Sequence, residues 1–507
     1  MESISRVEVM REFTVNFPIS LAIVLLPYAA LCALIPLGSA ISFGGDEGYE
    51  LVKAFMVFKG FALYHQIWDD QPPLLTILLA LVFKLFGPSL LAARLLAATF
   101  GALLLSGLCF LIREAAGVAG ALFGALILLG SPQVVELCVS TMQEAPAFAI
   151  GMLALGALSR WRWSRSSGWL LLTGLLFGVA LQIKFTAGII FPAAALELVL
   201  EARRSEVGAL ASALRHVALL FAATLAAFVV LGWICGTGGI QMLWTSHFAL
   251  ATREFGSPDD YRFSPRLPLD HPDALIGVIV AVTVGLWTRR LREMRLPFVW
   301  LVTALFVHLC HRPWWDYYYL HFAIPMAWIS GLGFGMCFDS AKASARVTGS
   351  SLRRAVGRRL VGILAVAALI GISCALSLPR CLTEIERLRE SDLVQDSPLL
   401  QEIAKQKKET EWFYSTRPIY AFHAKMPVPP ELVVVSRKRL WSGNISPERE
   451  LELLRRYHPA QMALAVTERN PPLIRFVEEN YSLAFDDGEN RLYIRHSLTN
   501  RDVNLRQ

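Results

Sequence analysis

Charged residues are scarce in this chain of 507 residues. Asp, Glu, Lys and Arg make up only 18% of the sequence, whereas hydrophobic residues make up 55% and the mean hydropathy is +0.48. A soluble globular protein has about a quarter of its residues charged. The composition therefore excludes an ordinary soluble enzyme and predicts an integral membrane protein.

Cysteine motifs and internal repeats are also missing from the sequence. The 8 cysteines lie in or beside apolar segments without C-x-x-C spacing, so we predict neither a zinc site nor a disulfide framework. No repeat is evident, which argues against a transporter built from inverted repeats. The net charge of +7 is spread along the chain, and we therefore expect no nucleic-acid partner.

Long apolar runs recur along the first 380 residues. A spanning helix needs about 20 apolar residues, and fewer where neighbouring helices shield its ends. The first run is too long and unbroken for the core of a signal peptide, so we expect an uncleaved anchor. The candidate spans, about eleven, lie at 17–40, 91–112, 117–135, 142–159, 168–183, 186–201, 216–236, 273–288, 297–310, 320–338 and 360–378.

Basic residues set the orientation of these spans. If Arg6 and Arg11 are cytoplasmic, alternate connections should be basic. They are, since these connections carry Arg113; Arg160, Arg162 and Arg165; Arg203, Arg204 and Arg215; residues 289–295; and residues 342–359. The outer side then holds 41–90, 237–272, 311–319 and everything after about 379.

The sequence divides into two predicted domains. Residues 1–379 form a mostly α, polytopic membrane helix bundle whose first exoplasmic loop, 41–90, contains two short helices. Residues 380–507 are richer in charge and predict a small exoplasmic α/β domain. Its short strands are expected at 411–416, 431–436, 461–466 and 491–495, and an amphipathic helix at 446–459.

Carboxylates are concentrated in the first exoplasmic loop. Asp46 and Glu47 begin the stretch "DEGYELVKAFMVFKG", and Asp69 and Asp70 precede a double proline. Asp46 is also suited to cap the helix that follows it, with Glu47 placed favourably against the helix dipole. Capping does not exclude catalysis, so both roles stay open.

Three more charged residues interrupt apolar runs near the predicted outer side. They are Arg94, Glu144 and Lys184, and each costs about 2.5 to 3.5 kcal/mol at the centre of a span. Arg94 and Lys184 could instead extend to the membrane surface, and Glu144, followed by Pro146, could start a helix. All three nevertheless lie at a similar predicted depth in the membrane, close to that of Asp46, and this favours a functional site there.

The segment "HRPWWDYYY" at 311–319 combines aromatic and charged residues. Aromatic clusters often anchor a membrane protein at the interface. Aromatic faces beside polar groups also bind sugar rings, and the Arg312 guanidinium is suited to bind a phosphate through two hydrogen bonds. Both interpretations are open from the sequence.

The order of these motifs resembles a known family. The stretches "DEGYE", "WDDQPPLLTILLALVFKLFG", "GLLFGVALQIKFTAGIIFPA" and "RPWWDYYYLHFAIPMAWISGLG" are similar to the protein O-mannosyltransferase-like and aminoarabinose-transferase-like membrane glycosyltransferases. The resemblance implies a GT-C-type fold and inverting transfer of a sugar from a polyprenyl-phosphate donor. It matches the Asp-Glu pair of the first loop to Asp46 and Glu47, a second-loop carboxylate to Glu144 and a cavity lysine to Lys184.

These observations lead to a set of predicted site residues. Asp46 is the expected catalytic base, because attack on an anomeric carbon requires removal of the acceptor's proton. The full assignment is Asp46, Glu47 and Glu144 as catalytic residues; Arg94, Lys184 and Arg312 as partners of the donor phosphate; and Tyr49, Trp68, Asp69, His311, Tyr317 and Tyr318 in the substrate cavity. A divalent metal ion bridging Asp46 and Glu144 is compatible with the sequence, but no ligand cluster requires it.

The expected partners follow from this interpretation. They are a polyprenyl-phosphate sugar donor, membrane lipid, and a lipid, glycan or protein acceptor. The chain lacks room for the large soluble insert of eukaryotic-type protein mannosyltransferases, which favours a multi-pass protein of a bacterial inner membrane. The alternatives are a lipid-linked glycan ligase or polymerase, which shares the donor type, and a multispanning transporter.

Overall fold

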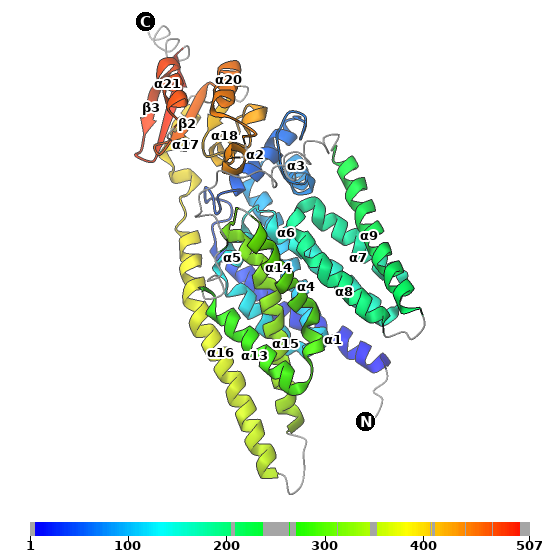
Figure 1. Cartoon of the computed structure of the whole chain (residues 1–507). Coiled ribbons are helices and arrows are strands. Elements are labelled where there is room, and N and C mark those ends of the chain that lie inside the picture. The colour runs from blue at the N-terminus through cyan, green and yellow to red at the C-terminus, as the bar shows by residue number, and fades with distance from the viewer. Residues whose placement is uncertain are drawn as a thin grey trace.

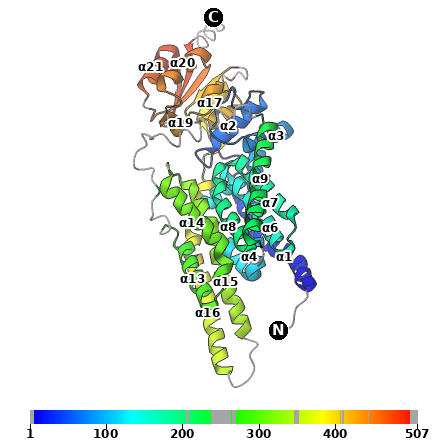
Figure 2. The same ribbon diagram turned by 45° about the vertical axis from the view of Figure 1, so that its right-hand side comes forward.

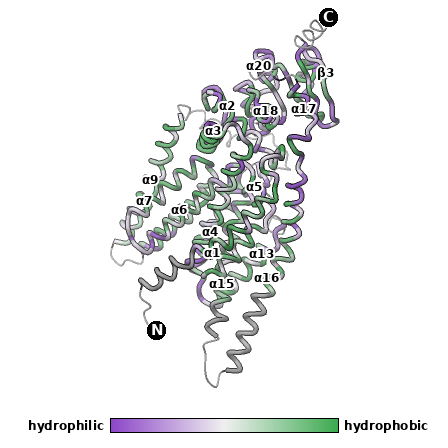
Figure 3. The backbone as a smooth tube through the Cα atoms, turned by 180° about the vertical axis from the view of Figure 1, so that it is seen from behind, coloured by the Kyte–Doolittle hydropathy of each residue, from purple (hydrophilic) through white to green (hydrophobic). Residues whose placement is uncertain are grey.

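The chain folds into an elongated, mostly helical molecule with a small sheet at one end (Figure 1). This computed structural model describes residues 6–203, 208–236, 263, 270–311, 313–344, 352–405, 407, 411–441, 443–468 and 470–496. Hydrophobic residues dominate the helices of the bundle, and hydrophilic ones gather at the end that carries the sheet (Figure 3). The predicted class, a helix bundle with a small C-terminal α/β domain, is confirmed.

The bundle is built around α15 (Leu320–Ser344). This helix packs closely against α4. A Cβ added to Gly120 of α4 would lie only 2.6 Å from the carbonyl oxygen of Gly331, so the absence of a side chain at Gly120 allows the close approach. The other helices of the bundle are α1 (Arg6–Leu34), α4 (Leu90–Leu129), α5 (Pro132–Val139), α6 (Glu144–Ser164), α7 (Ser167–Ile183), α8 (Phe191–Ala202), α9 (Ala209–Ile234), α13 (Pro272–Thr288), α14 (Arg295–Cys310) and α16 (Leu352–Arg389). Figure 2 separates the α6 to α9 group from the α13 to α16 group.

The number of long apolar helices differs from the predicted eleven spans. Within the described residues, 6 helices are long and apolar enough to cross a membrane, or 7 if the bent pair α5 and α6 is one span. Four more apolar helices have only 10–17 residues: Leu21–Leu34, Leu74–Phe86, Ser167–Ile183 and Pro272–Thr288. Several predicted spans therefore form shorter or bent helices.

The predicted spans 91–112 and 117–135 are counted together as one helix, although the chain bends at the predicted boundary between them. Both fall largely in α4, which has non-helical geometry at Gly117, with φ 71°. The Sγ of Cys109 lies 3.8 Å from the carbonyl oxygen of Ala121, although residues twelve apart in a straight helix are about 18 Å apart. The chain thus folds back near Gly117, where glycine tolerates a positive φ.

The first loop carries the two predicted short helices, α2 (Glu47–Phe58) and α3 (Leu74–Phe86). They share an apolar cluster with the C-terminal domain. The ring of Phe422 lies 6.2 Å from that of Phe55 and 5.4 Å from that of Phe83. The domain is therefore packed directly on the loop that holds the predicted catalytic residues (Figures 1 and 2).

The predicted start of the C-terminal domain, residue 380, lies within α16, which ends at Arg389. The sheet of the C-terminal domain has the order β1-β2-β4-β3, with β1 and β2 parallel and the other pairs antiparallel. The elements are α17 (Pro398–Lys405), β1 (Phe413–Ser415), α18 (Ile419–Ala424), α19 (Arg437–Trp441), α20 (Pro447–Tyr457), β2 (Gln461–Ala465), α21 (Pro471–Asn480), β3 (Tyr481–Asp486) and β4 (Asn490–Arg495).

Three of the four predicted strands are confirmed, and the strand at 431–436 is wrong. A turn of 3-10 helix, Pro430–Leu432, occupies its start. The guanidinium of Arg439 donates to the carbonyl oxygens of Glu431 and Val434, both at 2.7 Å. These carbonyls are therefore engaged by a side chain and do not join the sheet.

Candidate active site

A cavity of about 490 Å3 lies where the helix bundle meets the C-terminal domain. Its walls come from the start of α2, the loop before α3, the bend between α5 and α6, Lys184 after α7, the segment before α15, and residues 434–438. Six predicted residues line it: Asp46, Tyr49, Asp69, Glu144, Lys184 and Tyr317. The fold thus brings together residues from six separate parts of the sequence.

A second cavity, of about 560 Å3, lies against the other side of the same loop. Gly45 and Tyr49 line both cavities, but none of the predicted catalytic carboxylates lines this one. The cavity that contains Asp46 is therefore the candidate active site.

Asp46 occupies the N-cap position of α2, yet its side chain makes no capping hydrogen bond. It lines the cavity instead. Burial raises the pKa of Asp46 to about 6, an effect that the Lys184 ammonium opposes and that the Glu144 and Glu50 carboxylates reinforce. Such a carboxylate is ionised near neutral pH but basic enough to accept a proton.

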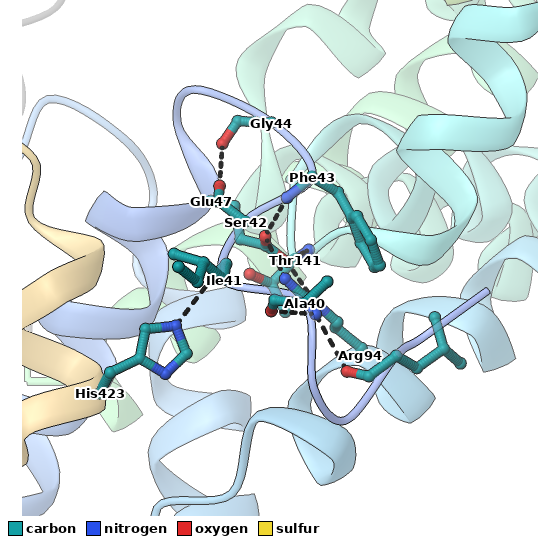
Figure 4. Close-up of polar contacts among 10 residues, drawn as sticks. Ala40, Ile41, Ser42, Phe43, Gly44, Glu47, Arg94, Thr141 and His423 are labelled. Carbon is teal, nitrogen blue, oxygen red and sulfur yellow. Dashed lines mark hydrogen bonds and ion pairs between the residues drawn. The ribbon is translucent and has the colours of Figure 1, made fainter. Parts of the chain in front are cut away.

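Glu47, unlike Asp46, has its carboxylate fully engaged by protein groups, several of which are drawn in Figure 4. It is fully buried, and its two oxygens accept from Arg94 Nε at 2.9 Å and from Arg94 Nη2 at 2.8 Å. They also accept from the backbone N–H groups of Phe43 at 2.9 Å and Thr141 at 3.2 Å. Glu47 does not line the cavity, and its four hydrogen bonds hold the loop in place.

Arg94, a predicted partner of the donor phosphate, has several partners within the protein. It is fully buried, and its Nη1 donates to the carbonyl oxygens of Leu37 and Ala40, both at 3.0 Å. Its guanidinium lies 3.9 Å from the ring centre of Phe43. Arg94 therefore fixes the segment that leads to Asp46 (Figure 4).

Glu144 and Lys184 form a buried ion pair beside Asp46. Glu144 is the first residue of α6, as its proximity to Pro146 suggested, and Lys184 lies between α7 and a short 3-10 helix, Phe185–Ile190. The Lys184 ammonium also lies 4.8 Å from the ring centre of Tyr317. Glu144 Oε2 is buried and has no hydrogen-bond partner among the described residues.

The donor set at this point does not fit the metal ion considered for Asp46 and Glu144. The described residues contain no group of three or more His, Cys, Asp or Glu side chains that could hold a metal. The Lys184 ammonium pairs with Glu144, where a bridging cation would lie. An ammonium at this distance opposes binding of a second cation.

A second charged cluster lines the cavity, and the sequence interpretation missed most of it. Lys53 pairs with Glu50 and with Asp69, both at 2.9 Å. Burial raises the pKa of Asp69 to about 7, although Lys53 lowers it. The i, i+3 spacing of Glu50 and Lys53 in α2 was the signal available in the sequence.

Three predicted cavity residues do not line the cavity. The ring of Trp68 is covered by the guanidinium of Arg439, 4.4 Å from the ring centre. His311 caps the C-terminal end of α14, and its ring lies 6.1 Å from that of Tyr318. Arg312 lies outside the described residues.

The C-terminal domain also holds the loop of Asp46. The backbone N–H of Ile41 donates to the carbonyl oxygen of Asp392 at 2.7 Å. His423 of α18 lies with its Nε2 2.9 Å from the carbonyl oxygen of Ile41 (Figure 4). A Cβ on Gly48 would lie 2.9 Å from the backbone nitrogen of Ile419, so only glycine allows this approach of α2 to α18.

Comparison with known proteins shows what this chain resembles. Residues 70–233, about a third of the chain, match the family model described as dolichyl-phosphate-mannose-protein mannosyltransferase. No curated protein matches the chain as a sequence relative. The resemblance to GT-C-type, polyprenyl-phosphate-dependent membrane glycosyltransferases is confirmed.

Solved structures give particular relatives. ArnT from Cupriavidus metallidurans bound to undecaprenyl phosphate is 16% identical, with a TM-score of 0.65 over 95% of this chain and 98% of that one. The apo state of the same protein gives 0.63 at 15% identity, covering 96% and 98%. The archaeal oligosaccharyltransferase AglB from Archaeoglobus fulgidus gives 0.50 at 14% identity, covering 96% and 75%. At these identities the likeness is one of fold.

Proposed function

We propose that this protein is a membrane glycosyltransferase that moves a sugar from a polyprenyl-phosphate donor to an acceptor at the outer face of the membrane. The observation that carries the proposal is Asp46, a basic carboxylate in a cavity at the end of an apolar helix bundle. The similar fold of ArnT, solved with undecaprenyl phosphate, supports a lipid-phosphate donor. We retain the predicted topology of about eleven spans, an exoplasmic C-terminal domain and a bacterial inner membrane.

The proposed reaction is a single displacement. The acceptor's hydroxyl oxygen attacks the anomeric carbon, and Asp46 accepts the hydroxyl proton. The bond between the anomeric carbon and the phosphate oxygen breaks, and polyprenyl phosphate leaves with the electron pair. Attack from the face opposite the leaving group inverts the anomeric configuration.

The neighbours of Asp46 have separate roles in this proposal. Glu47 and Arg94 hold the loop, so Asp46 keeps its position while substrates exchange. Lys184, paired with Glu144, supplies a positive charge that stabilises ionised Asp46 and the departing phosphate. The aromatic ring of Tyr317, on the same wall, is suited to contact a sugar ring.

The pH dependence of the reaction should report Asp46. Since its pKa is about 6, we expect kcat/KM to fall about tenfold per pH unit below that value and to level off above it. The donor is a phosphodiester, which stays ionised throughout this range. The measurement is a kcat/KM profile from pH 5 to 8, and a flat profile would exclude Asp46 as the base.

Loss of the gene should leave a chemical trace. We expect cells without it to accumulate a polyprenyl-phosphate sugar and to lack one sugar on an envelope lipid, glycan or protein. Mass spectrometry of lipid-linked sugars and envelope glycans measures both. Unchanged envelope glycans would contradict the proposal. Transfer of a whole oligosaccharide would favour a lipid-linked glycan ligase.

A further inference from the structure

The accessible cations of the active-site cavity belong to the C-terminal domain. Lys53, Lys184, Arg437 and Lys438 line the cavity. The Lys53 and Lys184 side chains are 2% and 9% exposed, and both are paired with carboxylates deep in the wall. The Lys438 side chain is 20% exposed, and Arg437 is exposed. Arg437 and Lys438 are therefore the cations of the cavity lining that are most exposed to a ligand.

These two residues belong to residues 435–441, which we call the cationic arm. Packing on the membrane part of the chain fixes its position. The Tyr49 hydroxyl donates to the carbonyl oxygen of Val435 at 3.0 Å, which ties the arm to α2. The ring of Trp441 stacks on that of Trp315, with centroids 6.3 Å apart and planes 5° apart.

Arg439 fixes the middle of the arm. Its guanidinium covers the ring of Trp68 at 4.4 Å and donates to two carbonyl oxygens of its own domain, as described above. The arm is thus bound on both sides of Arg437 and Lys438. Charges held in place in this way lose little freedom when they bind a ligand.

We propose that the cationic arm is the phosphate-recognition element of the cavity, with Arg437 and Lys438 as the residues that bind a phosphate group. This inference rests on the proposed function. Lys438 donates to Asp70 at 2.6 Å, which uses one of its three N–H groups and directs the ammonium to the cavity. Arg437 adds a planar guanidinium group, which can donate two hydrogen bonds to phosphate oxygens.

A phosphate group could reach the arm from two sources. One is the phosphate of the polyprenyl donor, and the other is a phosphate carried by the acceptor's headgroup. Both present the same anionic oxygens to Arg437 and Lys438. A donor site would bind undecaprenyl phosphate itself. An acceptor site would bind a headgroup phosphate and would leave the binding of undecaprenyl phosphate unaffected.

The test uses the full-length protein in phosphatidylcholine nanodiscs. The probes are undecaprenyl phosphate, for the donor, and inorganic phosphate, for a headgroup. We expect Arg437→Gln and Lys438→Gln each to weaken binding about tenfold, as loss of a charge-assisted contact does. Lys438→Arg should retain binding. Arg455→Gln, an exposed cation of α20 away from the cavity, is the matched control.

The pattern of losses identifies the source. Weaker binding of undecaprenyl phosphate supports the arm as a donor site, and weaker binding of inorganic phosphate alone supports it as an acceptor site. Affinities equal to wild type for both probes in the Arg437→Gln/Lys438→Gln variant would overturn the proposal. If that variant also transfers sugar at the wild-type rate, the proposed function stands without the arm.

Discussion

Asp46→Asn is expected to lower the turnover of sugar transfer by about a hundredfold to ten-thousandfold, the range found when a general base is lost. Asparagine keeps the shape of the side chain but cannot accept the acceptor's proton. Folding should be unaffected, because the Asp46 side chain makes no capping hydrogen bond. Turnover is measured on purified protein with a polyprenyl-phosphate sugar.

The direction of the change in stability caused by Asp46→Asn can also be predicted. The folded-state pKa of Asp46, about 6, lies above the ordinary value of 3.8, so the folded protein binds the proton more tightly than the unfolded chain. Ionised Asp46 therefore destabilises the fold above pH 6, and Asp46→Asn removes this effect. We expect a thermal midpoint at pH 7.5 no lower than that of the wild type.

Asp316→Asn is the matched control for Asp46→Asn. It makes the same chemical change at an exposed carboxylate that lines the same cavity. Near-normal turnover is expected. If Asp46→Asn also kept near-normal turnover, the base would be another residue, and equal losses in the two variants would point to the overall charge of the cavity.

Arg94→Met is expected to lower the free energy of unfolding by about 3–5 kcal/mol, the effect of breaking a buried ion pair. Glu47 would stay fully buried without its bidentate partner, and Leu37 and Ala40 would lose their donor. Sugar transfer should fall as well, because the segment before Asp46 loses its anchor. Denaturant titration of the protein in detergent measures the stability.

The double variant Arg94→Met/Glu47→Met separates stability from positioning. An apolar pair removes the unpaired charge, so much of the lost stability should return. Transfer should stay low, because Phe43 and Thr141 no longer have an acceptor for their N–H groups. If Arg94→Met instead kept its stability and bound polyprenyl phosphate less tightly, Arg94 would belong to the donor site.

Several candidate residues could be found from the sequence because the predicted topology sets how deep each residue lies in the membrane. Asp46, Glu144 and Lys184 lie in different segments, but alternation of the spans placed all three near the outer side. A charged residue in an apolar run is costly unless it has a partner or a function. These three residues, with Tyr317, do line one cavity.

The pairing within the site could not be read from the sequence. Glu47 and Arg94 are 47 residues apart, and Asp70 and Lys438 are 368 apart. Hydropathy and charge patterns carry no information on which of several buried charges meet. The pairing of Arg94 with Glu47 and the approach of the cationic arm to the cavity could therefore be identified only from the structure.

The expected strand at 431–436 differs from the structure for a local physical reason. The segment is apolar enough for a strand, but the Arg439 side chain engages its carbonyl groups. The fold-back at Gly117, by contrast, falls at the predicted boundary between the spans 91–112 and 117–135.

The measurement that tests the central claim most directly uses wild-type protein in closed liposomes with a donor labelled in its sugar. An extract of the cell envelope supplies the acceptor. We predict one polyprenyl phosphate released for each labelled sugar that becomes attached to the acceptor, with inverted anomeric configuration. An intact donor in the presence of every envelope extract, or a labelled donor that only changes membrane side, would contradict the account.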